Sequence, residues 1–241
     1  MARNQPLEPF RFQQFAVGHD RCSMKVGTDA VLLGCWASTA GCLRVLDIGT
    51  GSGVIALMIA QRTGGNVFID AIDIQLQDLR QAAENFAASP WSGRMNAIHS
   101  SLQEFSPSHR YDLIVSNPPF FNKSLRAPDA GRTVARHSDD LPHDSLLSWA
   151  REHLSDTGRL AIVIPPLEGG RWKESATGAG LHLCRQCEIR SGIGRPVERW
   201  LLEWSMQSTA PAYSSLHLYD NGQFSKEYAS WTSEFYLPKV Q

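Results

Sequence analysis

The chain has 241 residues, a formal net charge of −1, 42% hydrophobic and 20% charged residues. This length suits one large α/β domain, and the composition is ordinary for a soluble globular protein. A transmembrane helix and a signal peptide are not expected, because the chain lacks an apolar run of about 18 residues and an apolar segment after its charged N-terminus. The five cysteines are an odd number that fits free thiols, so we expect a cytoplasmic protein.

The first forty residues differ in pattern from the rest of the chain. Residues 10–15 alternate aromatic and polar side chains, which predicts a half-buried strand, and residues 28–37 have a helical pattern. No linker or repeat divides the chain. We therefore expect one domain over residues 1–241, with residues 1–40 as an N-terminal extension on a core of residues 41–241.

Strand and helix signals alternate through the core. The pattern predicts strands over 43–48, 67–73, 95–99, 111–116, 159–164, 181–189 and 197–205, and helices over 54–61, 76–88 and 142–153. Repeated strand–helix units form an open sheet with helices on both faces. The expected fold is a doubly wound, mostly parallel, seven-stranded α/β sheet.

A glycine-rich turn follows the first core strand. Gly49, Gly51 and Gly53 alternate before a helix, where glycine lets the backbone turn sharply and approach a ligand closely. The dinucleotide pattern Gly-x-Gly-x-x-Gly fails, because Val54 stands at its last glycine position. Asp73 ends the second strand, where a carboxylate can accept hydrogen bonds from ribose hydroxyls. The alternation of glycines resembles the cofactor loop of class I methyltransferases, and it makes cofactor ligands of Asp47, Gly49, Thr50, Gly51, Gly53, Asp73 and Ile74.

The tetrapeptide Asn117-Pro118-Pro119-Phe120 directly follows the fourth strand. Ligands of such sheets bind at the carboxyl ends of the strands. Two prolines hold the backbone extended and remove two N–H donors, so the Asn117 oxygen and the Pro118 carbonyl remain as fixed acceptors beside the Phe120 ring. Acceptors aimed at an NH2 group stabilise the positive charge that develops on its nitrogen during methylation, and Phe120 would stack on the base. These four residues are the candidate catalytic group, and Asn117 is also a candidate cofactor contact.

The sequence is similar to the bacterial tRNA1(Val) (adenine-37 N6)-methyltransferase family. The similarity is most specific in residues 23–34, SMKVGTDAVLLG, and extends to Ala135-Arg136-His137, to residues 222–228 and to residues 235–237. It implies S-adenosylmethionine (SAM) as cofactor and methylation of the N6 amine of an adenine, at position 37 beside the anticodon of a valine tRNA. The partner would be the tRNA anticodon stem-loop, and we expect a monomer that binds neither membrane nor metal.

The resemblance adds further candidate site residues. Lys25, Thr28 and Asp29 would lie near the cofactor or the substrate entrance, although Thr28 could equally cap a helix and Lys25 could be a solvated charge. By the resemblance, Arg136 and His137 would face RNA phosphates. The local excess of basic residues in 122–137 makes Lys123, Arg126 and Arg132 candidate phosphate contacts beside them. Many such enzymes carry an acidic residue after the third strand. Here Ser101 or the backbone beside Leu102 would bind the cofactor adenine instead.

Several alternatives remain open from the sequence alone. A protein glutamine N5-methyltransferase or an rRNA guanine-N2 methyltransferase would use the same acceptor pair on another amine. A DNA adenine methyltransferase would need a target-recognition domain, for which the chain has little room. A SAM-binding RNA chaperone without turnover is the non-enzymatic alternative. The spacing of His182, Cys184 and Cys187 resembles half of a zinc site, but a structural zinc needs four ligands and no second pair is present.

Overall fold

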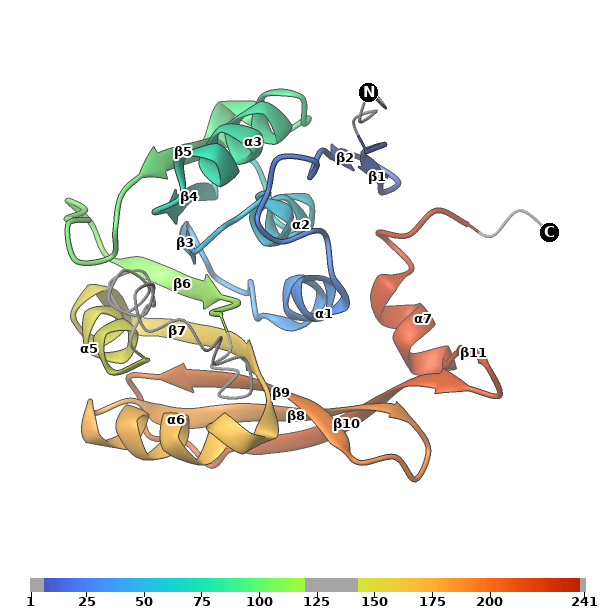
Figure 1. Cartoon of the computed structure of the whole chain (residues 1–241). Helices are drawn as coiled ribbons and strands as arrows, with labels where there is room; N and C mark the ends of the chain where they lie inside the picture. The colour runs from blue at the N-terminus through green and yellow to red at the C-terminus, as the bar shows by residue number, and fades with distance from the viewer. Residues whose placement is uncertain (1–6, 120–142, 239–241) are drawn as a thin grey trace, which may run out of the picture.

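The structure, a computed structural model, describes residues 7–119 and 143–238. A nine-stranded sheet organises them, in the order β11-β10-β8-β9-β7-β6-β3-β4-β5 (Figure 1). Its parallel half contains β3 (Arg44–Ile48), β4 (Phe68–Asp73), β5 (Met95–His99), β6 (Tyr111–Ser116) and β7 (Leu154–Ile164). Most residues of β3, β4 and β6 are buried, which explains why these strands are nearly continuous apolar runs in the sequence.

The other half of the sheet mixes strand directions. It contains β8 (His182–Gly192), β9 (Val197–Ser205), β10 (Ala212–Asp220) and β11 (Gln223–Phe224). β9 is antiparallel to both β7 and β8, β10 is parallel to β8, and β11 is antiparallel to β10. The doubly wound, mostly parallel fold is confirmed. The seven expected strands are contiguous from β8 to the edge strand β5, and β10 and β11 extend the sheet beyond β8.

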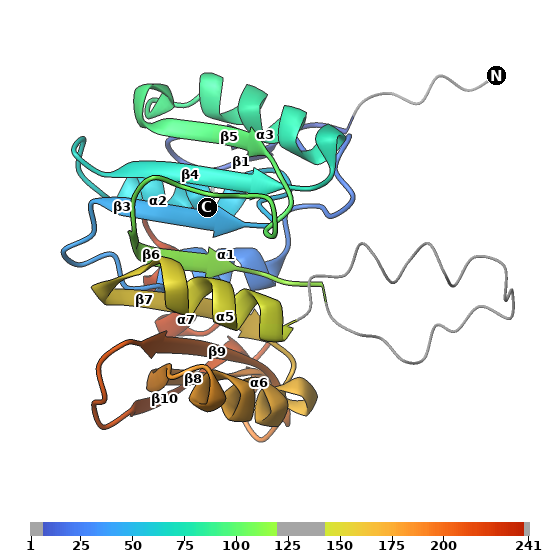
Figure 2. The same ribbon diagram turned by 90° about the vertical axis from the view of Figure 1, so that its left-hand side faces the viewer.

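Helices cover both faces of the sheet, as Figure 2 shows. α1 (Thr28–Trp36), α2 (Val54–Arg62), α3 (Leu76–Ala87) and α7 (Lys226–Thr232) contribute to one apolar core. α5 (His143–His153) and α6 (Pro166–Gly178) pack on the opposite face and contribute to a second core. A short 3-10 helix, η1 (Ser92–Arg94), precedes β5. Pro166 begins α6 shortly after the end of β7.

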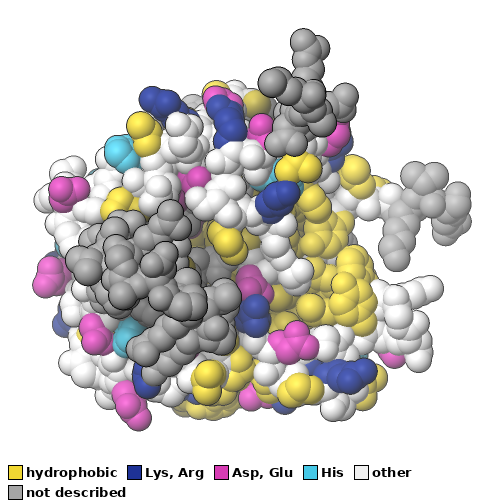
Figure 3. All heavy atoms as spheres, in the orientation of Figure 1, with side chains coloured by type: hydrophobic (Ala, Val, Ile, Leu, Met, Phe, Trp, Pro, Cys, Tyr) yellow, Lys and Arg dark blue, Asp and Glu magenta, His cyan; other side chains and the backbone are white. Residues whose placement is uncertain are grey.

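The N-terminal extension folds differently from its sequence pattern. The predicted single strand over residues 10–15 is wrong: β1 (Phe10–Arg11) and β2 (Ala16–Val17) form an antiparallel hairpin. Phe12 is buried and forms a bridge with Tyr236 near the other end of the chain. Hydrophobic side chains gather in Figure 3 between the hairpin and α7. The two ends of the described chain therefore stabilise each other.

Membrane and metal features are absent from the described part of the chain. None of the helices within residues 7–119 and 143–238 combines the length and the apolar character that crossing a membrane requires. In the same residues no group of three or more His, Cys, Asp or Glu side chains could hold a metal ion. All five cysteines are free thiols, and Cys184 donates to the Glu203 carbonyl oxygen at 3.2 Å. The expectation that no metal is bound stays a prediction.

Candidate functional site

The glycine turn connects β3 to α2 at the carboxyl edge of the sheet. Gly49, Gly51 and Gly53 have φ angles of 68°, 54° and 81°, in the left-handed region that favours glycine. The backbone N–H groups of Gly49 and Thr50 both donate to the Ile72 carbonyl, which attaches the turn to β4. A Cβ built at Gly49 or Gly51 would have no neighbouring atom within 4 Å. The turn is thus a fixed backbone cradle with open space above it.

Asp73 ends β4 beside this turn. The β3–β4 register pairs Ile48 with Ile72, so Gly49 and Asp73 come next on adjacent strands. Asp73 Oδ2 accepts from the Gly51 N–H and Oδ1 accepts from the Gln75 N–H, both at 2.8 Å. Burial raises the pKa of this carboxyl, and the two backbone N–H groups oppose the shift. The carboxylate is held in one orientation at the place where the sequence predicts a ribose contact.

Asp47 lies beneath the turn and is fully buried. The Thr50 hydroxyl donates to Asp47 Oδ2 at 2.6 Å, whereas Oδ1 has no hydrogen-bond partner among the described residues. Burial raises the pKa of Asp47 to about 7, and the Thr50 hydrogen bond opposes that shift. Asp47 therefore fixes the turn from below through Thr50.

The raised pKa of Asp47 predicts a pH-dependent stability. An ordinary Asp has a pKa of about 3.9, so folding favours the protonated carboxyl. Its contribution to stability is present below about pH 4 and is lost as the pH rises through about 7. Relative to that of Asp47→Asn, the free energy of unfolding of the wild type should decrease by up to roughly 4 kcal/mol between about pH 4 and about pH 7. Urea unfolding of both proteins at several pH values measures the difference. Parallel pH profiles would contradict the assignment.

The segment after β5 holds the predicted adenine contacts. Ile74 directly follows β4 and is 45% exposed. Its carbonyl oxygen lies 3.0 Å from His99 Nε2 at the end of β5. The Ser101 hydroxyl donates to Glu104 Oε2 at 2.9 Å. The Leu102 side chain is buried in the core of the α5–α6 face. Since the Leu102 side chain packs inward, only backbone groups at this position remain available to a ligand.

Asn117, Pro118 and Pro119 follow β6 at the same edge of the sheet. β6 pairs with β3 so that Ser116 lies opposite Ile48, and the Ser116 hydroxyl donates to the Ile48 carbonyl at 2.9 Å. Asn117 is half-buried, Pro118 is buried and Pro119 is exposed. Asn117 and Gly49 are thus the next residues on two paired strands. Five predicted RNA contacts and one catalytic residue lie outside the described residues: Lys123, Arg126, Arg132, Arg136, His137 and Phe120.

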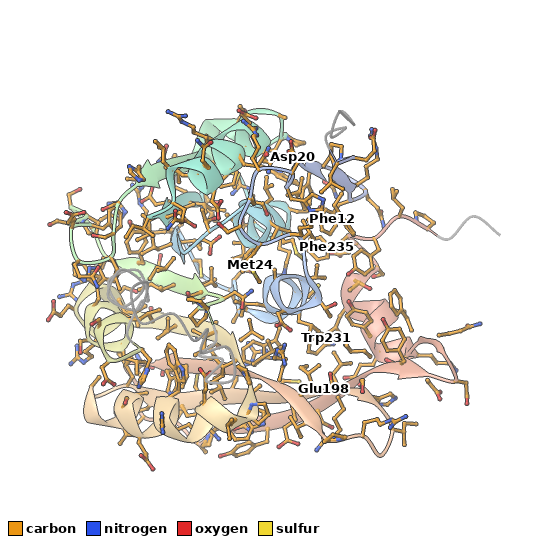
Figure 4. All side chains as sticks on the ribbon, viewed as in Figure 1. Phe12, Asp20, Met24, Glu198, Trp231 and Phe235 are labelled. Atoms are coloured by element: carbon orange, nitrogen blue, oxygen red, sulfur yellow. The ribbon has the colours of Figure 1, made fainter. Side chains whose placement is uncertain are left out.

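The segment between β2 and α1, on which Figure 4 labels Asp20 and Met24, is joined to α3 by hydrogen bonds from the Ser23 N–H to Asp78 and from Arg21 Nε to Gln81. Lys25 is exposed. Thr28 is the first residue of α1, and the capping position is Gly27, which makes no side-chain capping bond. Asp29 accepts from Arg199 Nε at 2.8 Å, so this carboxylate is paired with β9. The structure places these residues at the start of α1, on the same edge as the glycine turn.

Asn85 on α3 is a site residue that the sequence reasoning missed. Its Nδ2 donates to the carbonyl oxygens of Gly18 and Ser52, both at 2.8 Å, and its Oδ1 accepts from the Gly18 N–H at 2.9 Å. Asn85 is buried, and it joins the N-terminal segment directly to the glycine turn. No local signal marks this residue, because a single polar side chain on an amphipathic helix is ordinary.

Comparisons with known proteins show the family of the chain. The family model of the methyltransferase small domain matches residues 24–170. A tRNA1(Val) (adenine(37)-N6)-methyltransferase of Klebsiella pneumoniae is 42% identical over 237 residues, which cover 96% of each chain. The chain belongs to this methyltransferase family.

Solved structures support the fold of this methyltransferase. A predicted O-methyltransferase from Agrobacterium tumefaciens aligns with a TM-score of 0.66 and 17% identity, over 86% of this chain and 96% of that one. The glycopeptide N-methyltransferase MtfA, solved with SAM, aligns with a TM-score of 0.54 and 12% identity, over 75% of this chain and 93% of that one. At sequence identities this low, the similarity shows a shared fold.

Proposed function

We propose that this methyltransferase transfers the methyl group of SAM to the N6 amine of adenine 37 in a valine tRNA. The observation that carries the proposal is the placement of Asn117-Pro118-Pro119 at the carboxyl end of β6, one strand from the glycine turn. Similarity over nearly the whole chain to enzymes named for this reaction supports the choice of substrate.

The residues at the glycine turn fit SAM. Gly49 and Gly51 leave the backbone open to a close ligand. Asp73 is oriented by two backbone N–H groups and keeps acceptor capacity for the ribose hydroxyls. Ile74 offers an exposed apolar side chain beside it for the adenine ring. When bound, SAM supplies an activated methyl group on a positively charged sulfur.

The acceptors after β6 suit an aromatic amine. The N6 lone pair of adenine is delocalised into the ring, so the amine is a weak nucleophile. In the proposed site the Asn117 side-chain oxygen and the Pro118 carbonyl accept from the NH2 group and stabilise the positive charge that develops on nitrogen. The two prolines fix their φ angles and so restrict the backbone that carries these acceptors. No strong general base is required, because the methylated ammonium releases its proton readily.

A loop adenine suits such an enzyme because it is already partly unstacked, so moving it into the site costs little free energy.

The experiment that tests the proposal uses total tRNA from a strain that lacks this protein, with purified enzyme and labelled SAM, followed by nucleoside digestion and mass analysis. We expect labelled N6-methyladenosine among the nucleosides, and labelling of a valine tRNA transcript that is lost when guanine replaces adenine 37 assigns the position.

Unmodified RNA provides the control for that experiment. A valine tRNA transcript with guanine at position 37 should remain unlabelled. Labelled protein or rRNA with silent tRNA would contradict the proposed substrate and favour glutamine or guanine methylation, while keeping the methyltransferase assignment.

A further inference from the structure

A cavity lies at the edge of the sheet opposite to the glycine turn. Its volume is about 640 Å³, and it opens between the end of α1 and strands β7, β8 and β9. Arg159 pairs with Leu113 near the start of β6, whereas Asn117 follows the end of that strand. The cavity is therefore separate from the proposed methylation site.

Three arginines from three different elements line this cavity, and each is held in place. Arg62 of α2 donates from Nη1 to the carbonyl oxygens of Gly34 and Ala37, at 2.7 and 2.8 Å. Arg159 of β7 donates from Nη1 to the Ser38 hydroxyl at 2.7 Å. These hydrogen bonds restrict the guanidinium groups before a ligand binds. Binding therefore costs less side-chain conformational entropy.

Arg185 of β8 is fixed in two ways. Its guanidinium carbon lies 4.2 Å from the centre of the Trp36 ring, and its Nη1 donates to Glu203 Oε2 at 3.2 Å. A guanidinium has five N–H donors. Among the described residues, Arg62 makes both of its bonds through Nη1, so its Nε and Nη2 donors have no protein partner there. Donors therefore remain for a ligand.

The charges around the cavity do not balance. Glu203, the one acidic residue among those lining it, is completely buried and also accepts from the Ser38 N–H at 3.1 Å. Arg185 alone would neutralise this carboxylate, and Arg159 Nε lies 3.9 Å from it. Burial lowers the pKa of Arg62, and the nearby Glu234, which does not line the cavity, opposes this shift. Among the lining residues, three arginines face one carboxylate, and this excess of positive charge favours an anion.

Hydroxyl groups surround the arginines. Side chains that can donate to oxyanions line the cavity from several segments: Ser38, Thr39, Thr157 and Thr209. The Ser205 hydroxyl, which also lines it, donates to the Gln207 carbonyl at 2.7 Å. We propose that this cavity binds a phosphate group, held by Arg62, Arg159 and Arg185 and by these hydroxyls. Guanidinium forks match the paired oxygens of phosphate. The volume lies within the range of small-ligand sites, roughly 300–1,000 Å³.

Binding of pyrophosphate and of inorganic phosphate tests the proposal directly. Isothermal titration of the full chain would use potassium chloride at equal ionic strength as the reference. We expect saturable pyrophosphate binding by the wild type and a Kd at least about tenfold higher for Arg159→Gln. Arg159 is chosen because Arg185 still pairs with Glu203 in this variant, so the fold is expected to persist. The matched control is Arg171→Gln, an exposed arginine of α6 outside the cavity, which should bind like the wild type.

Two sources could supply the phosphate, and a competition experiment separates them. If tRNA displaces pyrophosphate from the wild type, the cavity takes a phosphate of the RNA backbone. If both bind together, it takes a free phosphorylated compound. Absence of saturable binding beyond the chloride reference, or an unchanged Kd in folded Arg159→Gln, would overturn the proposal. Methyl transfer is not part of the readout, so the result is independent of the proposed function.

Discussion

Replacing Asn117 by alanine should lower the kcat for N6-methyladenosine formation by about two to three orders of magnitude, the usual loss when one preorganised group that stabilises transition-state charge is removed. The Asn117 oxygen is the only side-chain acceptor of the described Asn-Pro-Pro segment, since proline offers its carbonyl alone. Charge on the amine develops during the reaction, so the loss should fall on kcat and much less on the Kd of SAM. Single-turnover methylation of the valine tRNA, together with SAM titration, measures both quantities.

Asn66→Ala serves as the control for this variant. Asn66 is exposed on the turn before β4, far along the chain from the acceptor segment, and its replacement should leave kcat unchanged. Circular dichroism and thermal unfolding should match the wild type for both variants, because Asn66 is exposed and Asn117 is only half-buried. A folded Asn117→Ala enzyme with near wild-type kcat would remove the acceptor role from this residue.

The parts of the fold that the sequence predicts are those with a local cause. Strands β3, β4 and β6 are buried on both faces, so continuous apolar runs mark them. β10 was missed because most of its residues are exposed or only partly buried, and its sequence AYSSLHLYD shows no clean alternation. α7 was missed as a helix although Ser225 caps it by accepting from the Tyr228 N–H, which is a recognisable start signal.

The candidate site likewise contains residues whose placement the sequence predicts and residues whose placement it does not. The positions of Gly49, Asp73 and Asn117 follow from strand ends, because parallel strands bring their carboxyl ends to one edge. Their mutual placement was thus predictable before any register was known. The Asn85 bridge and the Asp29–Arg199 pair were not, since each depends on side chains that meet only after the sheet and its helices have packed. Both polar connections are products of tertiary structure, and sequence patterns do not encode them locally.

Replacing Gly53 by alanine should destabilise the fold by about 3 kcal/mol. Gly53 has a φ angle of 81°, which costs an alanine roughly 1–2 kcal/mol. A Cβ at this position would also overlap the Phe86 ring of α3, lying 2.9 Å from Cζ and closer still to Cε1, and such overpacking costs about 1–3 kcal/mol. For a chain of this size the loss corresponds to a decrease in Tm of roughly 6–12 °C. Urea unfolding monitored by tryptophan fluorescence measures it.

Gly65→Ala is the matched control, because Gly65 has no unusual φ angle and a Cβ there meets no atom within 4 Å. Its effect should be close to zero. A double-mutant cycle of Gly53→Ala with Phe86→Leu separates the two costs: the smaller side chain should recover the steric part and leave the conformational part. Strictly additive effects would mean that Phe86 is not what requires glycine at position 53.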